Sequence, residues 1–560
     1  MKRWAKLLLG SVAAVGAGLY LSADYIKLNM NRWLSEPTQP NRPVNWQQGP
    51  AQAPQGQRPP NIILIMADDL GFNDVSITGQ GVAGTPTPNI DAIGREGVVF
   101  TQGYAGNATC APSRAALMTG RYATRFGYEF TPTDVKLPGW FPTSLIRPDA
   151  MFARNIANFA SDWDVKPVFD EEAAKNLPPP GNKGMPASEI TIAEQLQSRG
   201  YHTVHLGKWH LGEAKGMRPE DQGFDESLGF MIGGQMFLPE DHPQVVNSKQ
   251  DFDPIDRFLW ANLPYSLQYN GGQRFAPDRY MTDYLSHQAV QSIRANRNRP
   301  FFMYLAYNAP HTPLQALKSD YDALSGIKDH RARVYAAMVR ALDRGVGQVM
   351  AELKRQGLDD NTLVIFTSDN GGAHYVGLPQ INRPYRGWKA TFYEGGTHLP
   401  FLMRWPARIA SGSRFGSPVS QFDIFSTASA AAGSALPADR PVDGVDLLPF
   451  VGGDATGVPH RTLFWRSGGY RAVLHDGWKL HSLTHPAGER LYHLASDPTE
   501  QTDVAAREPA RVAALKAMLA AHDRTQMPAA WPSLIRSPIP LDRPMGVKPV
   551  AKEPYIYWWN

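Results

Sequence analysis

The chain has 560 residues, 42% of them hydrophobic, which is enough apolar material for a large buried core and excludes an intrinsically disordered protein. Lys and Arg total 56 against 52 Asp and Glu, and the net charge of +4 is too small for this length to indicate a nucleic-acid partner. A single cysteine excludes any disulfide within the chain, so Cys110 needs a different explanation.

Residues 1–35 have the pattern of a targeting segment. Three basic residues precede an apolar run over residues 7–21, which is short for a membrane-spanning helix of about 20 residues. A cleavage site can follow Ala23, although Leu21 is unfavourable three positions before the cut. Residues 7–23 are therefore either part of a cleaved signal peptide or an uncleaved membrane anchor. Both alternatives predict an exported protein, periplasmic or secreted.

The rest of the chain divides into a linker and two domains. Residues 36–60 are rich in Pro, Gln and Asn, which predicts an unstructured linker. A large domain is predicted over residues 61–456 and a small C-terminal domain over residues 457–560. Residues 136–186 show little periodicity, which predicts an insertion within the large domain. Because long irregular loops often bind ligands, this insertion is a candidate for selecting a substrate.

Short apolar runs predict the strands of the large domain. Helical stretches separate these runs, which is the pattern of an α/β sheet. The clearest helix covers residues 333–354, where apolar residues recur at helical spacing. The predicted strands are 61–66, 204–206, 301–306, 363–366 and 401–403.

The small C-terminal domain has a different pattern. Short alternating runs at residues 462–465, 470–474 and 478–480 predict strands, and residues 509–522 predict a helix. The combination indicates a small sheet packed with one helix.

Oxygen-bearing side chains follow two predicted strands of the large domain. Asp68 and Asp69 follow the strand at 61–66, and Asp369 and Asn370 follow the strand at 363–366. At the carboxyl ends of strands in one sheet, these four side chains suit Ca²⁺ or Mg²⁺. Each pair alone is more typical of an ordinary turn or helix cap, but together they form a candidate ligand set.

The sequence CAPSR at residues 110–114 has the most distinctive composition. Pro112 is typical of the first turn of a helix, so Cys110 is predicted at the amino end of a helix, where anions bind favourably. Arg114 lies four residues later on the same face and can reach the same anion. The alternative is that Cys110 is an inert buried thiol, which is the usual state of a lone cysteine.

This stretch resembles the signature of the sulfatase family, C-x-P-S-R followed by L-T-G-R, with Met118 inserted before Thr-Gly-Arg. The resemblance spans roughly residues 60–500. It implies an alkaline-phosphatase-like α/β fold, with a large mixed sheet between helices and a small C-terminal α+β domain containing an antiparallel sheet. Further family landmarks are ADDLG at 67–71, TPNID at 87–91, GKWHLG at 207–212, QGFD at 222–225, SDNG at 368–371 and YEGG at 393–396.

The resemblance implies an arylsulfatase-like sulfuric ester hydrolase acting on aryl sulfates or sulfated carbohydrates. In this family a maturation enzyme oxidises the signature cysteine, here Cys110, to formylglycine (3-oxoalanine). One hydroxyl of the hydrated aldehyde attacks sulfur and expels the alcohol. The second hydroxyl then loses its proton, the aldehyde reforms and sulfate leaves, a route closed to unmodified Ser or Cys.

The resemblance also implies the cation and the remaining catalytic residues. It favours one Ca²⁺, and a cation can polarise the ester and lower the pKa of a hydroxyl. Lys208 would bind sulfate and His210 would contact the formylglycine hydroxyl. These two residues stand two apart on a segment predicted to be extended, so they should face one way. The metal ligands implied are Asp68, Asp69, Cys110, Asp369 and Asn370.

His311 and Lys389 match the remaining family positions and are expected to assist the leaving group. Either can supply the proton that the departing alcohol needs, and the sequence leaves this choice open. His374 is a further candidate to face the substrate. The predicted catalytic set is Cys110, Arg114, Lys208, His210, His311 and Lys389.

Two other functions remain as alternatives. A formylglycine-dependent hydrolase of phosphonate or phosphate esters in the same superfamily would use a similar nucleophile and cation. A non-catalytic binder of sulfated glycans would be expected to have an incomplete nucleophile or metal set and an extended basic surface. Contacts to the alcohol part of the substrate are expected from residues 136–186 and from the C-terminal domain, where no motif identifies them.

Overall fold

The computed structural model describes residues 37–53, 56, 58–132, 150, 153–154, 156–157, 165–179 and 182–560. The predicted targeting segment at residues 1–35 lies outside the described residues, as does most of the first half of the predicted insertion. None of the helices in the described part of the chain combines the length and apolar character needed to span a bilayer.

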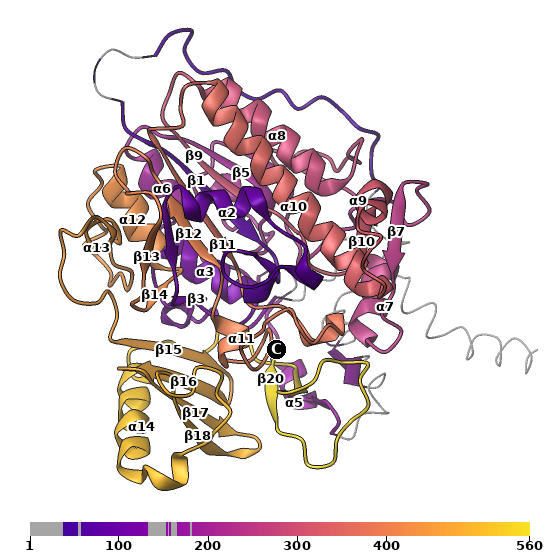
Figure 1. The fold of residues 1–560 in the computed structure, drawn as a ribbon, viewed down its shortest axis with the longest axis vertical. Helices are drawn as coiled ribbons and strands as arrows, with labels where there is room; N and C mark the ends of the chain where they lie inside the picture. Colours follow the sequence, from indigo (N-terminus) through magenta and orange to yellow (C-terminus); the bar gives the residue numbers. More distant parts are fainter. Residues whose placement is uncertain are drawn as a thin grey trace, which may run out of the picture.

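A nine-stranded mixed sheet forms the centre of the fold (Figure 1). Its order is β13-β2-β12-β11-β1-β9-β5-β6-β8, and the run from β11 to β6 is parallel. β12 and β8 run antiparallel to their neighbours β11 and β6. The five strands predicted from apolar runs are β1, β5, β9, β11 and β12, and the predicted α/β class is confirmed. The strands are β1 (Asn61–Ala67), β2 (Val98–Phe100), β5 (His202–Lys208), β6 (Glu226–Phe230), β8 (Gln268–Tyr269), β9 (Phe301–Ala306), β11 (Thr362–Ser368), β12 (Phe401–Arg404) and β13 (Ser413–Phe415).

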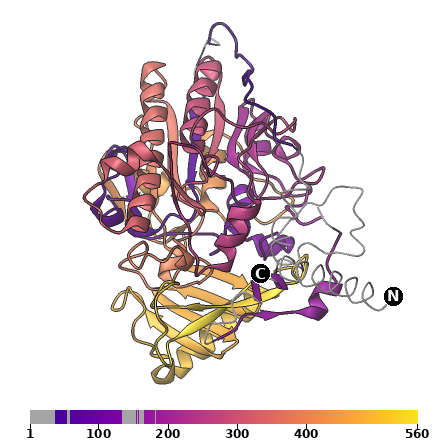
Figure 2. The same cartoon turned by 90° about the vertical axis from the view of Figure 1, so that its right-hand side faces the viewer.

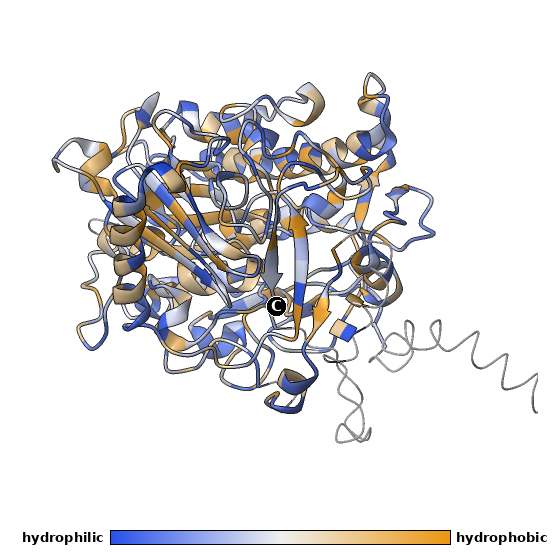
Figure 3. Cartoon of the chain, turned by 90° about the horizontal axis from the view of Figure 1, so that it is seen from below, coloured by the Kyte–Doolittle hydropathy of each residue, from blue (hydrophilic) through white to orange (hydrophobic). Residues whose placement is uncertain are grey.

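Helices cover both faces of this sheet (Figures 1 and 2). Alternate side chains of β1 point to opposite faces, as the pleat requires: Ile63 and Ile65 join one apolar cluster, Ile62 and Leu64 the other. Apolar residues run through the interior helices and strands, whereas many outer turns are hydrophilic (Figure 3). The first face carries α2 (Pro88–Arg95), α8 (Met281–Asn296) and α10 (His330–Arg355), and the second carries α3 (Cys110–Thr119), α6 (Ile192–Gln197) and α12 (Asp423–Ala431).

A four-stranded antiparallel sheet follows near the C-terminus. α14 (Pro509–Asp523) packs on it through Leu515 and Leu519, which contact Val473, Leu480 and other strand residues in one cluster. The predicted C-terminal sheet with one helix is thereby confirmed. Its strands are β15 (Thr462–Ser467), β16 (Tyr470–His475), β17 (Trp478–Thr484) and β18 (Ala487–His493).

A third, three-stranded sheet joins the predicted insertion to the end of the chain. β19 (Ile535–Pro540) pairs with β20 (Tyr555–Trp559) on one side and with β4 (Val168–Phe169) on the other. The expectation that residues 136–186 are irregular is wrong for this part, which contains β4 and α5 (Glu171–Lys175). β4 is only two residues long and forms against a distant strand, so no local periodicity signals it.

The remaining elements are short and lie in the connections. The helices are α7 (Pro254–Asn262), α9 (Lys318–Ala323), α11 (Glu394–Thr397) and α13 (Leu448–Gly452). The strands form two small pairs, β3 (Gly103–Tyr104) with β14 (Val419–Ser420) and β7 (Val245–Ser248) with β10 (Leu314–Leu317). The 3-10 turns are η1 (Phe72–Asp74), η2 (Val82–Gly84), η3 (Ala123–Phe126), η4 (Pro219–Gln222), η5 (His374–Val376) and η6 (Ala505–Arg507).

Candidate active site

The predicted site residues meet where the parallel strands β11, β1, β9 and β5 end. Asp68 and Asp69 directly follow β1, and Asp369 directly follows β11. Lys208 is the last residue of β5, and His311 follows β9. Because these strands are neighbours and run in one direction, their carboxyl ends bring the five side chains to one edge of the sheet.

Three carboxylates at this edge are almost completely buried, with exposures of 0% for Asp68, 2% for Asp69 and 0% for Asp369. The backbone amide of Asp69 donates to Asp369 Oδ1 over 3.1 Å, and Asn370 Nδ2 donates to Asp69 Oδ1 over 2.8 Å. Burial raises the pKa of Asp68 to about 8, against the opposing effect of Lys208. Burial alone would also raise the pKa of Asp69, but the positive Lys389 and the nearby His311 lower it below the usual range.

Three cations pair with these carboxylates. Lys208 Nζ lies 2.8 and 2.7 Å from the two carboxylate oxygens of Asp68. Arg114 donates from Nε and Nη2 to Asp369 Oδ2 over 2.9 and 2.8 Å. Lys389 Nζ lies 2.9 Å from Asp69 Oδ2. Charges so deeply buried are tolerated because each is paired and hydrogen-bonded.

Arg114 and Lys208 were expected to reach a bound sulfate. Here both side chains turn to the carboxylates, and neither is among the residues lining the neighbouring cavity. Tyr304, on β9, accepts a further hydrogen bond from Arg114 Nη1 over 3.0 Å. The sequence analysis did not identify Tyr304 because it stands inside a buried apolar run, where an aromatic residue is ordinary core material.

Cys110 begins α3, at the amino end of the helix as predicted, and is 3% exposed. Its Sγ lies 3.8 Å from Asp69 Oδ1. Burial raises the pKa of the Cys110 thiol to about 12, although Lys208 and Lys389 oppose this shift. A protonated thiol is a poor nucleophile, so this environment does not activate cysteine as such.

His311 and Lys389 lie together beside Asp69. His311 Nδ1 donates to the backbone carbonyl of Thr312 over 2.6 Å. This bond leaves Nε2 of His311 3.5 Å from Lys389 Nζ and 3.6 Å from Asp69 Oδ2. The two groups expected to assist a leaving alcohol are thus adjacent, and both line the cavity.

The backbone conformation at His210 differs from the predicted one. Its φ of +61° is left-handed, so the segment after Lys208 turns instead of remaining extended. The prediction that Lys208 and His210 face one way on an extended segment is therefore wrong in its premise. His210 lines the cavity, and a Cβ on Gly233 would lie 3.0 Å from its imidazole ring, so glycine leaves room for that ring.

Tyr375 is a site residue that the sequence analysis missed. Its hydroxyl donates to Asp69 Oδ2 over 2.9 Å and accepts from Lys389 Nζ over 3.0 Å. The neighbouring His374 was expected to be a candidate to face the substrate, but it is not among the residues lining the cavity. Both residues lie in the turn η5, and only the turn geometry determines which side chain enters the site.

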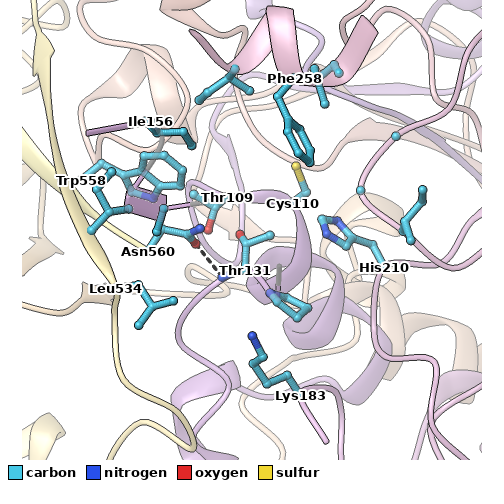
Figure 4. A pocket seen from close by; sticks show the side chains of 18 of the residues that line it. Thr109, Cys110, Thr131, Ile156, Lys183, His210, Phe258, Leu534, Trp558 and Asn560 are labelled. Atoms are coloured by element: carbon cyan, nitrogen blue, oxygen red, sulfur yellow. Dashed lines mark hydrogen bonds between the residues drawn. The ribbon is translucent and has the colours of Figure 1, made fainter. Parts of the chain in front are cut away.

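A cavity of about 230 Å³ adjoins this cluster (Figure 4). Cys110, His210, His311, Tyr375 and Lys389 contribute to its lining. The arrangement places a buried cysteine, paired acids and bases and several carboxylate and amide oxygens beside one cavity.

Comparison with known proteins shows what the whole chain resembles. The family model described as Sulfatase matches residues 60–434. N-acetylgalactosamine-6-sulfatase of Canis lupus familiaris is 31% identical over 444 residues, covering 78% of this chain and 73% of that protein. Steryl-sulfatase of Mus musculus is 31% identical over 506 residues, covering 78% and 74%. The crystal structure of Ps i-CgsB in complex with k-i-k-neocarrahexaose is 31% identical, with a TM-score of 0.68 and coverage of 85% of this chain and 95% of that one.

Proposed function

The chain belongs to the sulfatase family and is a sulfuric ester hydrolase, and from this premise we propose that Cys110, converted to formylglycine, is its nucleophile beside one bound Ca²⁺. Membership confirms the resemblance found in the sequence motifs. The observation that carries the proposal is the meeting of Cys110 with Asp68, Asp69 and His311. One ligand atom from each of these residues lies within 4.8 Å of the others.

The donor atoms suit a hard cation. Carboxylate and amide oxygens from Asp68, Asp69, Asp369 and Asn370 are the ligands that Ca²⁺ prefers. Asn370 Oδ1 is buried and has no hydrogen-bond partner among the described residues, as expected of an oxygen reserved for a ligand. When bound, the cation would polarise the ester and lower the pKa of a nearby hydroxyl.

The side chains around Cys110 define what the modified residue would do. In the modified residue, a hydroxyl of hydrated formylglycine would take the place of Sγ at the amino end of α3. When hydrated, formylglycine would supply two hydroxyls on one carbon: the first would bond to sulfur as the alcohol leaves with a proton, and loss of the second hydroxyl's proton would reform the aldehyde and release sulfate. His311 and Lys389 adjoin this position. Burial lowers the pKa of His311 to about 3, so its Nε2 is free to accept a proton, whereas the ammonium of Lys389 carries one.

The same proposal includes maturation and export. A formylglycine-generating enzyme must act on Cys110, and residues 7–23 would take the chain to the periplasm or outside the cell. Detection of the full-length or shortened chain in membrane and soluble fractions would distinguish an anchor from a cleaved signal peptide.

The direct test is peptide mass spectrometry across Cys110 on protein produced with the maturation enzyme, paired with sulfate and phosphate release from matched aryl esters. We expect a loss of about 18 Da at Cys110, as the aldehyde nucleophile requires, and preferred sulfate release. Cys110→Ser should fold normally yet lose turnover. Wild-type rates in this variant would remove formylglycine from the mechanism, preferred phosphate release would support the phosphoesterase alternative, and an unmodified inactive cysteine would support the glycan-binding alternative.

A further inference from the structure

Apolar side chains line most of the cavity beside Cys110. α7 contributes Ile255, Phe258 and Leu259, and the C-terminal segment contributes Leu534, Ile535 and Trp558. Figure 4 shows Ile156, Leu534 and Trp558 on one side of this space, with Phe258 and His210 on the side of Cys110. An ester bound at Cys110 would therefore meet apolar walls with its alcohol part.

Most of the lining is apolar, and several of its polar groups already have partners. Asn560 Oδ1 accepts a hydrogen bond from the backbone amide of Thr131 over 2.8 Å, the dashed line in Figure 4. Lys183, Glu213 and Asn262 each interact with another group of the protein. Among the described lining residues, His210 has a buried Nδ1 without a hydrogen-bond partner. A sugar bears several hydroxyls that need partners when they leave water, and a mostly apolar lining satisfies few of them.

The apolar wall has its own small core. Ile156, Leu177, Leu534 and Ile535 pack in one cluster with exposures of 4–8%. The pairing of β19 with β4 brings the C-terminal segment to the earlier part of the chain. The C-terminal part of this wall lies beyond residues 60–434, which match the family model.

The volume of the cavity sets a size for its ligand. An apolar cavity of about 150 Å³ can bind benzene. The cavity of about 230 Å³ beside Cys110 therefore has room for more than one aromatic ring.

We infer that this cavity receives the alcohol part of the substrate, and that the natural substrate is the sulfate ester of an apolar alcohol larger than one aromatic ring. This inference rests on the proposed function, because it places the ester at Cys110. It selects among sulfate esters and excludes sulfated sugars as the preferred class.

Two matched pairs of esters test the inference on formylglycine-bearing protein, with sulfate release measured by ion chromatography. The first pair is 2-naphthyl sulfate and phenyl sulfate, whose leaving groups have similar acidity. We expect kcat/KM to be about tenfold higher for the naphthyl ester because a second ring is buried. The second pair is cyclohexylmethyl sulfate and galactose 6-sulfate, both esters of primary alcohols. We expect the apolar ester to be preferred by about tenfold or more, since sugar hydroxyls would lose their hydrogen bonds to water.

A pair of variants locates the preference. Phe258→Ala should lower the naphthyl-to-phenyl ratio several-fold, mainly through KM for the naphthyl ester. Phe450→Ala is the matched control, because Phe450 is a half-buried phenylalanine of α13 that does not line the cavity. An unchanged ratio in Phe258→Ala would overturn the assignment of this wall.

The outcomes separate the inference from the function on which it rests. Galactose 6-sulfate hydrolysed as well as cyclohexylmethyl sulfate would overturn the apolar substrate class while leaving the sulfatase proposal intact. Protein shown by mass spectrometry to carry formylglycine, yet releasing sulfate from none of the four esters, would overturn the proposed function itself.

Discussion

The hydroxyl of Tyr375 provides a sharp test of how the site is held together. This hydroxyl is hydrogen-bonded to both Asp69 Oδ2 and Lys389 Nζ. It therefore holds Asp69, a proposed metal ligand, in place relative to Lys389, which is proposed to assist the leaving alcohol. Hydrogen bonds to charged groups contribute about 1.5–3 kcal/mol. If the positioning is needed in the transition state, Tyr375→Phe should lower kcat/KM by about 10–100-fold, since about 1.4 kcal/mol is tenfold in rate.

The assay is sulfate release from an aryl sulfate, with kcat and KM determined separately and Tm measured for each variant. We expect kcat to fall while KM changes little, and Tm to fall no further than in the control, because each variant keeps its ring and loses one buried hydroxyl. Tyr201→Phe is the control, since it removes a buried hydroxyl that bonds to the carbonyl of Pro60, before β1 and away from the site. A kcat for Tyr375→Phe within about twofold of wild type, well below the tenfold step of 1.4 kcal/mol, would refute a positioning role.

Three further predictions concern stability and metal binding. Burial raises the pKa of Asp253 from 3.8 to about 8, so the folded chain keeps a proton that the unfolded chain loses, and stability should fall as pH rises between these values. Asp253→Asn keeps an N-cap acceptor for α7, so its Tm should fall less between pH 5 and pH 8 than that of wild type; an equal fall would contradict the assignment. Lys479→Met should destabilise the fold by about 3–5 kcal/mol, because it leaves two buried glutamates without their cation. The control Lys318→Met removes an exposed ion pair and should leave Tm nearly unchanged. Equal Tm values for the two variants would contradict this reasoning. Asp369→Ala should weaken Ca²⁺ binding, measured by calorimetry, by about tenfold or more, and an unchanged titration would remove Asp369 from the ligand set.

The central sheet could be predicted because each of its main strands carries a local signal. The run from Ile62 to Met66 is apolar on both faces, which is the property of a strand covered by helices on two sides. The helix α10 likewise follows from its periodic apolar residues. β4 has no such signal, because its two residues become a strand only by pairing with β19. Local periodicity thus finds the elements that bury their own apolar faces and misses those that a distant partner completes.

The same physical distinction separates the two parts of the site. Groups proposed to act on sulfate stand at strand ends and at the start of α3, where chain direction alone brings Asp68, Cys110 and Asp369 together. His210 and Tyr375 depend in addition on the conformation of single turns, which residue type does not determine. The apolar wall depends on contacts between segments far apart in sequence, such as Ile156 with Leu534 and Ile535. Selection of the alcohol therefore has to be sought in tertiary contacts, because an apolar residue that lines a cavity has the same local pattern as one that fills a core.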